Sequence, residues 1–239
     1  MQYPSLSVGL IFGFGAPIAV AYPGLEDGAP RLLRSFVTGL HDRHAVVASS
    51  QWQAGVQADL TPIGAHVLLG MPLRELTNRA VEVELVLGSE AARLPEQLAE
   101  ATSWAARYLL LDEVLLARLA AAREPPIVTL RAWSRLSELQ GRISVAELAV
   151  ELGTSRQHMA QEVRERLGFP PKTLARILRF QRALALLEDH SHRGAAALAW
   201  ECGYFDQAHF NRDFRQLTGS TPSEHLARRM PNGLGVASG

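Results

Sequence analysis

The spacing of apolar and polar positions changes its period along the chain. Before about residue 60 the apolar residues come in short runs or at every second position, as in 55–60, where Val56, Ala58 and Leu60 alternate with polar neighbours. This period of two predicts half-buried β-strands. From Pro95 onward the apolar residues return every three or four positions, which predicts amphipathic helices. The pattern therefore predicts a β-rich first part and a helical second part, an α+β chain.

The first part is expected to contain short strands, one capped helix and one long helix. Thr61 followed by Pro62 predicts a helix that runs toward Gly70, with a further helical turn at 73–77. The long helix is expected from residue 95 to about 122, its apolar stripe packing on the sheet or pairing with a second subunit. A loop is expected at 23–30. Extended segments are expected at 5–14, 16–22, 36–39, 45–48, 55–60 and 80–87.

The second part is expected to begin after the sequence Arg-Glu-Pro-Pro. Neither proline can continue a helix, so residues 123–126 are expected to link a β-rich domain, 1–122, to an all-α domain, 127–230. Helices are expected at 127–139 and 171–188. The last residues, 231–239, have the composition of a frayed tail.

Residues 144–222 contain one pattern twice. Each copy has an apolar helix, a turn centred on glycine, and a second helix opened by a capping residue, Ser155 or Asp206. Two helices joined in this way form a helix-turn-helix, and the long helix at 171–188 would connect the two copies. Leu148, Ala149 and Gly153 return as Leu198, Ala199 and Gly203, and after one inserted residue Met159, Val163, Gly168 and Pro171 return as Phe210, Phe214, Gly219 and Pro222.

The second helix of each copy is expected to read DNA bases. With Met159 and Phe210 directed inward, an advance of 100° per residue places one set of side chains opposite the core. Gln and Arg bind adenine and guanine edges in the major groove. A polar helix face that only meets water is the alternative, and two copies in register disfavour it. The outward residues are Gln157, Gln161, Arg164, Ala208, Arg212 and Arg215, with Gln207, Asn211 and Gln216 beside them.

Charge supports contact with DNA phosphates. Residues 1–126 carry 9 Lys and Arg against 13 Asp and Glu, whereas residues 127–239 carry 15 against 11. A basic second part suits a polyanion. Phosphate contacts, with surface salt bridges as the alternative for the charged residues, are expected at Arg156, Lys172, Arg176, Arg179, Arg182 and Asn211.

The stretch GYFDQAHFNRDFRQLTGSTP, together with RFQRALALL in the connecting helix, resembles the AraC/XylS family of bacterial transcription regulators. The resemblance implies two helix-turn-helix subdomains whose second helices enter successive major-groove faces on one side of the DNA. It implies base contacts at Gln157, Gln161, Gln207, Ala208 and Arg212. Ala208 offers no hydrogen bond, but its methyl group suits a thymine methyl group.

The first part is similar, at 55–88, to a segment of one AraC-like subgroup, whose N-terminal domains sense a small molecule or dimerise. Because relatives usually have more residues upstream, the domain is expected to lack its first portion. The aromatic residues of the first part either line an effector pocket or pack in the core. These residues are Phe12, Phe14, Tyr22, Phe36 and Trp52.

The first part contains no motif for catalysis. His41, Asp42 and His44 have no partner at metal-ligand spacing, so we expect them to be solvated, and no metal or cofactor is expected. The single cysteine, Cys202, is expected to pack on a buried helix, which argues against a nucleophile and suits a reducing cytoplasm. The chain is therefore expected not to be an enzyme.

The sequence thus predicts a cytoplasmic, sequence-specific DNA-binding transcription regulator. Its composition, 47% apolar and 20% charged, is typical of globular proteins, and no apolar run reaches membrane-spanning length. Double-stranded DNA is the expected partner. RNA polymerase, a small-molecule effector and a homodimer stay open as further partners, as does the choice between activation and repression. An enzymatic or purely dimerising N-terminal domain is the alternative.

Overall fold

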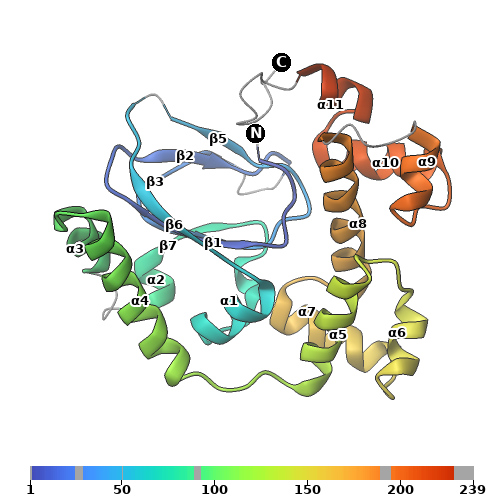
Figure 1. Cartoon of the computed structure of the whole chain (residues 1–239), viewed down its shortest axis with the longest axis horizontal. Helices are drawn as coiled ribbons and strands as arrows, with labels where there is room; N and C mark the ends of the chain where they lie inside the picture. Colours follow the sequence, from blue (N-terminus) through green and yellow to red (C-terminus); the bar gives the residue numbers. More distant parts are fainter. Residues whose placement is uncertain (1, 25–28, 50, 89–92, 189–194, 229–239) are drawn as a thin grey trace.

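A computed structural model describes residues 2–24, 29–49, 51–88, 93–188 and 195–228. A β-rich N-terminal part lies beside a helical C-terminal part, and helix α8, Pro171–Glu188, runs along the length of the latter (Figure 1). The predicted fold class is therefore confirmed. The predicted tail, 231–239, lies outside the described residues.

The strands of the described residues form two antiparallel sheets, with strand orders β6-β1-β4-β7 and β3-β2-β5. The predicted strands are present, and β3 is an addition that is too short for its period to be read from the sequence. It exists because it pairs with β2. The bounds are β1 Val8–Gly13, β2 Ile18–Ala21, β3 Arg31–Leu33, β4 Phe36–Thr38, β5 Val46–Ala48, β6 Gly55–Leu60 and β7 Ala80–Glu82.

Strand β1 lies between two layers of apolar side chains. Val8, Leu10 and Phe12 are fully buried in the cluster that the helices share, whereas Ile11 packs into the smaller cluster around Val20. Alternate residues of a strand point to opposite faces, so β1 serves both layers. Figure 1 shows the helices α1, α2 and α4 on one side of the larger sheet and the smaller sheet on the other.

Helix α1, Pro62–Leu69, begins as the sequence predicts. Thr61 Oγ1 accepts a hydrogen bond from Gly64 N at 3.1 Å, and Gly70 ends the helix with φ of 65°. A 3₁₀ turn, η1 (Leu73–Leu76), follows where a helical turn is predicted. The extended segment predicted at 80–87 is wrong in its second half, because helix α2, Val83–Leu87, follows β7.

The long helix predicted at 95–122 is wrong as a single element. It consists of α3, Leu94–Glu100, and α4, Trp104–Ala120. Ser103 Oγ accepts from Ala106 N at 3.1 Å and caps α4. This local bond competes with continuation of the preceding helix, which the apolar spacing alone does not reveal.

Helices are present where the sequence predicts them between residues 127 and 218, and a further helix, which is not predicted, follows at 222–228. Helices α6 and α7 form the first helix-turn-helix unit, α9 and α10 form the second unit, and α8 joins them (Figure 1). The bounds are α5 Ile127–Glu138, α6 Val145–Glu151, α7 Arg156–Leu167, α8 Pro171–Glu188, α9 Ala195–Glu201, α10 Gln207–Thr218 and α11 Pro222–Arg228.

The two units belong to different apolar clusters. The cluster that contains Leu10 and Leu73 of the N-terminal part continues through Met159 and Val163 of the first unit. The second unit packs around a separate cluster that includes Phe214. The core therefore crosses from the N-terminal part into the first unit.

Candidate nucleic-acid interface and effector cavity

The two units contain the same hydrogen-bonded turn. In each unit the turn glycine, Gly153 or Gly203, has a positive φ, which glycine adopts without strain. The turn bonds join Gly153 N to Val150 O at 3.1 Å and Thr154 N to Ala149 O at 3.0 Å in the first unit, and Gly203 N to Trp200 O at 3.0 Å and Tyr204 N to Ala199 O at 2.9 Å in the second. The repeat is therefore present in the backbone as well as in the sequence.

The second helix of each unit begins at the predicted cap. Ser155 Oγ accepts from His158 N at 3.1 Å at the start of α7, and Asp206 Oδ1 accepts from His209 N at 2.6 Å at the start of α10. The side chains predicted to point inward, which include Met159, are fully buried. The residues predicted to read bases are all exposed: Gln157, Gln161, Arg164, Gln207, Ala208, Arg212 and Arg215. Their contacts with bases stay predictions.

The residues predicted for phosphate contact differ in burial. Arg156 and Lys172 are exposed, and Asn211 is half-buried. The arginines of α8, predicted to lie outside, are instead half-buried because they bond neighbouring elements. Arg176 Nη1 donates to Gln216 Oε1 at 3.0 Å, Arg179 Nη1 donates to Gly141 O at 2.9 Å, and Arg182 Nη1 donates to Gln140 Oε1 at 2.9 Å.

Arg179 also lies over the ring of Tyr204, with its guanidinium carbon 5.5 Å from the ring centroid. Burial, and then the charge of Asp213, raise the pKa of Tyr204, so this ring stays neutral and keeps its hydroxyl proton. The contact joins α8 to the turn of the second unit. A phosphate bound by Arg179 would have to share the guanidinium with these contacts.

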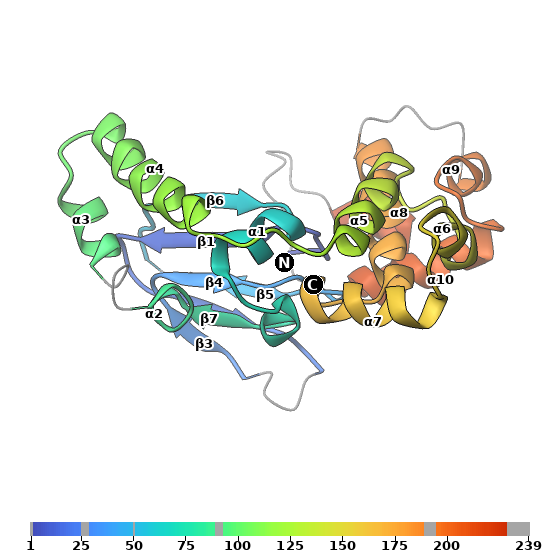
Figure 2. The same ribbon diagram turned by 90° about the horizontal axis from the view of Figure 1, so that it is seen from below.

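Helix α7 packs against the N-terminal part, at the boundary that Figure 2 shows. Arg74 Nη1 of η1 lies 3.0 Å from Glu165 Oε2 of α7, and Thr77 Oγ1 donates to Gly168 O at 3.3 Å. A Cβ at position 168 would lie 2.6 Å from Thr77 Oγ1. Glycine at this position therefore permits the close approach of the two parts.

A groove of about 1000 Å³ follows this contact. Arg74 and Glu75 line it from the N-terminal part, and Gln161 and Arg164 line it from α7. Two of the predicted base-reading side chains thus border the N-terminal part. The sequence gives no signal for this contact, because it joins segments far apart along the chain.

The second unit meets the N-terminal part through Tyr3. The Tyr3 ring centroid is 5.1 Å from that of His225 on α11 and 6.5 Å from that of Phe180 on α8, and the Tyr3 hydroxyl lies 3.1 Å from His225 Nδ1. This contact involves no residue of α10. Among the described residues, the groove beside η1 is lined by none of the predicted base-reading residues of α10.

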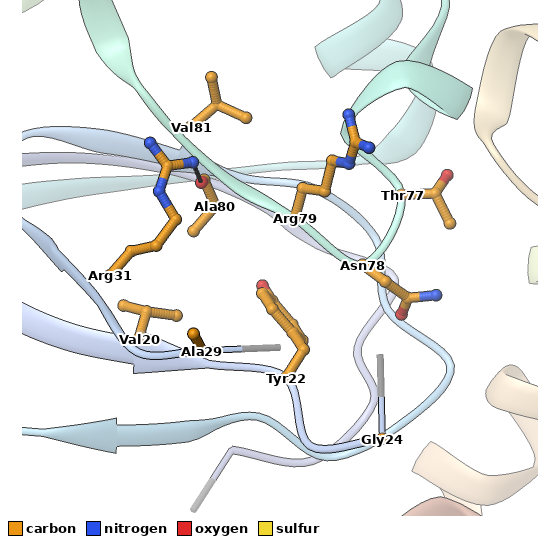
Figure 3. Close-up of a pocket in the computed structure, with 10 residues that line it drawn as sticks. All are labelled: Val20, Tyr22, Gly24, Ala29, Arg31, Thr77, Asn78, Arg79, Ala80 and Val81. Atoms are coloured by element: carbon orange, nitrogen blue, oxygen red, sulfur yellow. Dashed lines mark hydrogen bonds between the residues drawn. The ribbon is translucent and has the colours of Figure 1, made fainter. Parts of the chain in front are cut away.

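A cavity of about 820 Å³ opens beside β2, β3 and β7 (Figure 3). The Tyr22 ring extends into it, with Arg31 and Arg79 on either side of the hydroxyl. Arg31 Nη1 donates to Ala80 O at 3.0 Å. Burial raises the pKa of Tyr22 to about 12, so its hydroxyl remains a donor. The lining residues are Val20, Tyr22, Gly24, Ala29, Arg31, Thr77, Asn78, Arg79, Ala80 and Val81.

The other aromatic residues proposed for a pocket do not line this cavity. Phe12 and Phe36 are buried in the core, Phe14 is partly buried against it, and Trp52 is exposed. Of the five, Tyr22 is the residue that fits the pocket alternative.

Of the three residues predicted to be solvated, His41 is instead buried, whereas Asp42 and His44 are partly exposed. His41 is 5% exposed, with Nε2 2.9 Å from Tyr3 O and Nδ1 3.4 Å from Gly39 O. Burial lowers its pKa. The described residues contain no group of three or more His, Cys, Asp or Glu side chains that could hold a metal ion.

Cys202 is buried, and burial raises the pKa of its thiol to about 11. A thiol of this kind is protonated at neutral pH and is a poor nucleophile.

In the part of the chain that the structure describes, no helix combines the length and apolarity that crossing a membrane requires.

Comparison with known proteins assigns the second part. Residues 148–228 match a family described as "Helix-turn-helix domain", whereas the curated proteins gave no match. ToxT from Vibrio cholerae strain SCE256, in an unsaturated fatty acid bound form, is similar in structure over 94% of this chain and 88% of its own, with a TM-score of 0.51 and 12% identity. At this identity the likeness shows a shared fold.

Further structures match less than half of this chain. A probable AraC family transcriptional regulator from Rhodopseudomonas palustris CGA009 is 28% identical over 44% of this chain and all of its own, with a TM-score of 0.39. A DNA-binding transcriptional dual regulator from Escherichia coli K-12 is 28% identical over 43% of this chain and 98% of its own, with a TM-score of 0.37.

Proposed function

From the AraC-type helix-turn-helix domain that residues 148–228 form, we propose that the protein is a sequence-specific transcription regulator that acts in the cytoplasm. The observation that carries the proposal is the pair of units with matching turns and caps, each exposing a polar face on its second helix. Because Gln157 and Gln161 differ from Ala208 and Arg212, the two units would read unlike half-sites. We assign DNA binding to 127–230 and modulation to 1–122.

Selection from random DNA duplexes by the purified full-length protein tests this proposal. We expect one enriched sequence with two unlike half-sites about 10 base pairs apart, the spacing at which successive major grooves face one side of the duplex. A variant with Gln157→Ala and Arg212→Ala serves as the control and should enrich no such sequence. Recovery of unrelated duplexes by the unaltered protein would contradict the proposal.

The contact between η1 and α7 supports modulation by the N-terminal part. A helix with its side chains is about 10–12 Å wide and fills a major groove that is about 12 Å wide. Since Gln161 and Arg164 share a groove with Arg74 and Glu75, α7 and η1 would compete for that space. The first unit is therefore proposed to engage DNA after this contact opens.

The cavity around Tyr22 is the site that we propose for a small-molecule effector. Arg31 and Arg79 bring two positive charges, while Val20, Ala80 and Val81 supply apolar surface. A guanidinium has five donor hydrogens, so the bond from Arg31 to Ala80 O leaves others for a ligand. This combination suits an amphiphilic anion, and the ToxT structure that shares the fold contains an unsaturated fatty acid.

Thermal unfolding with straight-chain carboxylates, and with the matching alcohols as controls, tests the effector site. A ligand at 100 times its Kd stabilises the folded state by about 2.7 kcal/mol. We expect the carboxylates to raise the Tm and the alcohols and the Arg79→Gln variant to show a smaller rise. Equal shifts for carboxylate and alcohol would remove the arginines from the site.

The exposed face of α4 supports the alternative that the N-terminal part dimerises. Trp104, Tyr108, Leu109, Leu116 and Leu119 are all large, apolar and exposed on this helix. Contiguous exposed apolar side chains often mark an interface between proteins. Sedimentation of the protein and of a Leu109→Glu, Leu116→Glu variant separates this role from effector sensing, because dimerisation alone would be independent of the carboxylates.

A further inference from the structure

The turn of the second unit is one residue longer than that of the first, and the hydrogen bonds identify the extra residue as Phe205. Thr154 and Tyr204 are equivalent, since each donates its N–H to the alanine five residues earlier. In the first unit the cap, Ser155, follows at once. In the second unit Phe205 lies between Tyr204 and the cap, Asp206.

The core does not require this phenylalanine. Tyr204 is 3% exposed, and its ring centroid lies 5.2 Å from that of Phe210 and 5.3 Å from that of His209. Phe205 is 91% exposed. A polar residue or glycine would satisfy a turn at this position without placing an aromatic ring in water. The ring is therefore better explained by a contact outside this chain.

The position of Phe205 indicates what that contact is. It directly precedes the cap of α10, and the N-terminal end of a recognition helix is the end that meets base edges in the major groove. Ala208, the second residue of α10, is also exposed and apolar. The thymine C5-methyl group is the apolar feature that the major groove presents.

We propose that Phe205, together with Ala208, recognises the methyl group of a thymine in the half-site of the second unit. The proposal rests on the DNA-binding function proposed above. It also makes the two half-sites chemically different: the first unit has Ser155 and Arg156 at the corresponding end of α7, both polar, and has no equivalent of Phe205.

Replacement of thymine by deoxyuridine tests the proposal, because it removes the methyl group and keeps the base pair. The probe is the duplex selected by the full-length protein, with each thymine replaced in turn. Burial of one methyl-sized group is worth about fourfold in affinity. We expect the unaltered protein to lose about fourfold at one thymine of the second half-site.

Variants of exposed side chains provide the matched comparison. Phe205→Ser, which keeps the smaller contact from Ala208, should show a clearly reduced difference between the thymine and deoxyuridine duplexes, whereas Phe205→Leu should retain most of it. Trp200→Ser is the control, because Trp200 is an aromatic residue of the same unit that is also highly exposed, at 81%, and lies on α9 rather than at the start of α10. This control should keep the full difference.

The outcomes separate this inference from the proposed function. Equal sensitivity to deoxyuridine in the unaltered protein and Phe205→Ser, or a uniform loss of affinity for every duplex in that variant, overturns the methyl contact. A protein that selects no sequence at all contradicts the proposed function instead. Unchanged thermal unfolding of Phe205→Ser, expected for an exposed side chain, excludes misfolding as the cause.

Discussion

The two helix-turn-helix units share their turns and caps but differ in what they pack against. The buried residues of the first unit, such as Met159, belong to a cluster that extends into the N-terminal part. The second unit has its own cluster, with Phe214 at its centre between the rings of Phe180, Phe210 and His225. The same helix-turn-helix structure therefore packs against different neighbours in the two units.

This difference in packing predicts that regulation by the N-terminal part acts on the first unit. We expect a change in the N-terminal part to act directly on α7, through Arg74, Thr77 and the shared groove. It would reach α10 less directly, through α8, through the contact of Tyr3 with His225, and through His44, which lies beside Gly219 at the end of α10. The first unit is thus the one expected to respond to the N-terminal part, and the second is expected to bind its half-site more independently.

The largest expected effect tests the separation of the two clusters. Phe214→Ala removes a fully buried ring and should destabilise the second unit by about 3–5 kcal/mol. Hydrogen exchange should show loss of protection in α9 to α11 with α5 to α7 still protected. Val163→Ala is the control, because it lies in the other cluster and should lower protection in the first unit and the N-terminal part. If Phe214→Ala lowers the protection from hydrogen exchange in both units, the two clusters unfold as one cooperative structure.

A crosslink across the groove between η1 and α7 should give the second-largest effect. In an Arg74→Cys, Glu165→Cys variant, a short cleavable bismaleimide would hold η1 against α7. Loss of one module from a two-module binder lowers affinity by about 10²-fold. We expect this loss in a titration of the selected duplex, with protection of the second half-site retained in a footprint and full binding restored on cleavage.

The native cysteine should not interfere with the crosslinking. Cys202 is buried, and burial raises the pKa of its thiol to about 11, so it should react slowly with maleimide. Each single-cysteine variant treated with the reagent is the control. Undiminished binding by the crosslinked double variant would mean that α7 reaches its half-site with the contact closed.

Base reading by the second unit gives a smaller effect. Arg212→Ala should weaken binding of the selected duplex by about 1–3 kcal/mol and relax the preference at one base of the second half-site. Lys172→Ala, at a predicted phosphate contact, should weaken all duplexes alike and lower the salt dependence. If Arg212→Ala leaves both the affinity for the selected duplex and the base preference unchanged, Arg212 does not read a base.

The smallest expected effect concerns the ion pair at the boundary. Both side chains are partly exposed, so the pair contributes about 0.2–1 kcal/mol. Arg74→Glu should open the contact and raise affinity for the first half-site by at most a few-fold. The doubly reversed variant, Arg74→Glu with Glu165→Arg, should return affinity to its original value. If the single and double variants bind alike, the pair does not hold the contact.

Local sequence patterns predicted the helices and strands that are stabilised by interactions between residues near in sequence. Thr61 and Ser155 cap their helices through bonds to backbone three residues ahead, and the period-two pattern of 55–60 matches β6. The break between α3 and α4 escaped prediction, because the apolar spacing continues across the Ser103 cap. His41 shows the opposite error: its polar neighbours suggest solvent, but the fold buries it against Tyr3.

Residue spacing along the chain was enough to predict the repeated units and the outward faces of their second helices, because helix geometry follows from that spacing. The tertiary structure decided which of these faces meets the rest of the chain. Gly168 approaches Thr77, and Arg74 pairs with Glu165, across separations that no local pattern encodes. Likewise the repeat revealed one inserted residue, but burial of Tyr204 in the core was needed to show that Phe205 is the one left exposed beside the recognition helix.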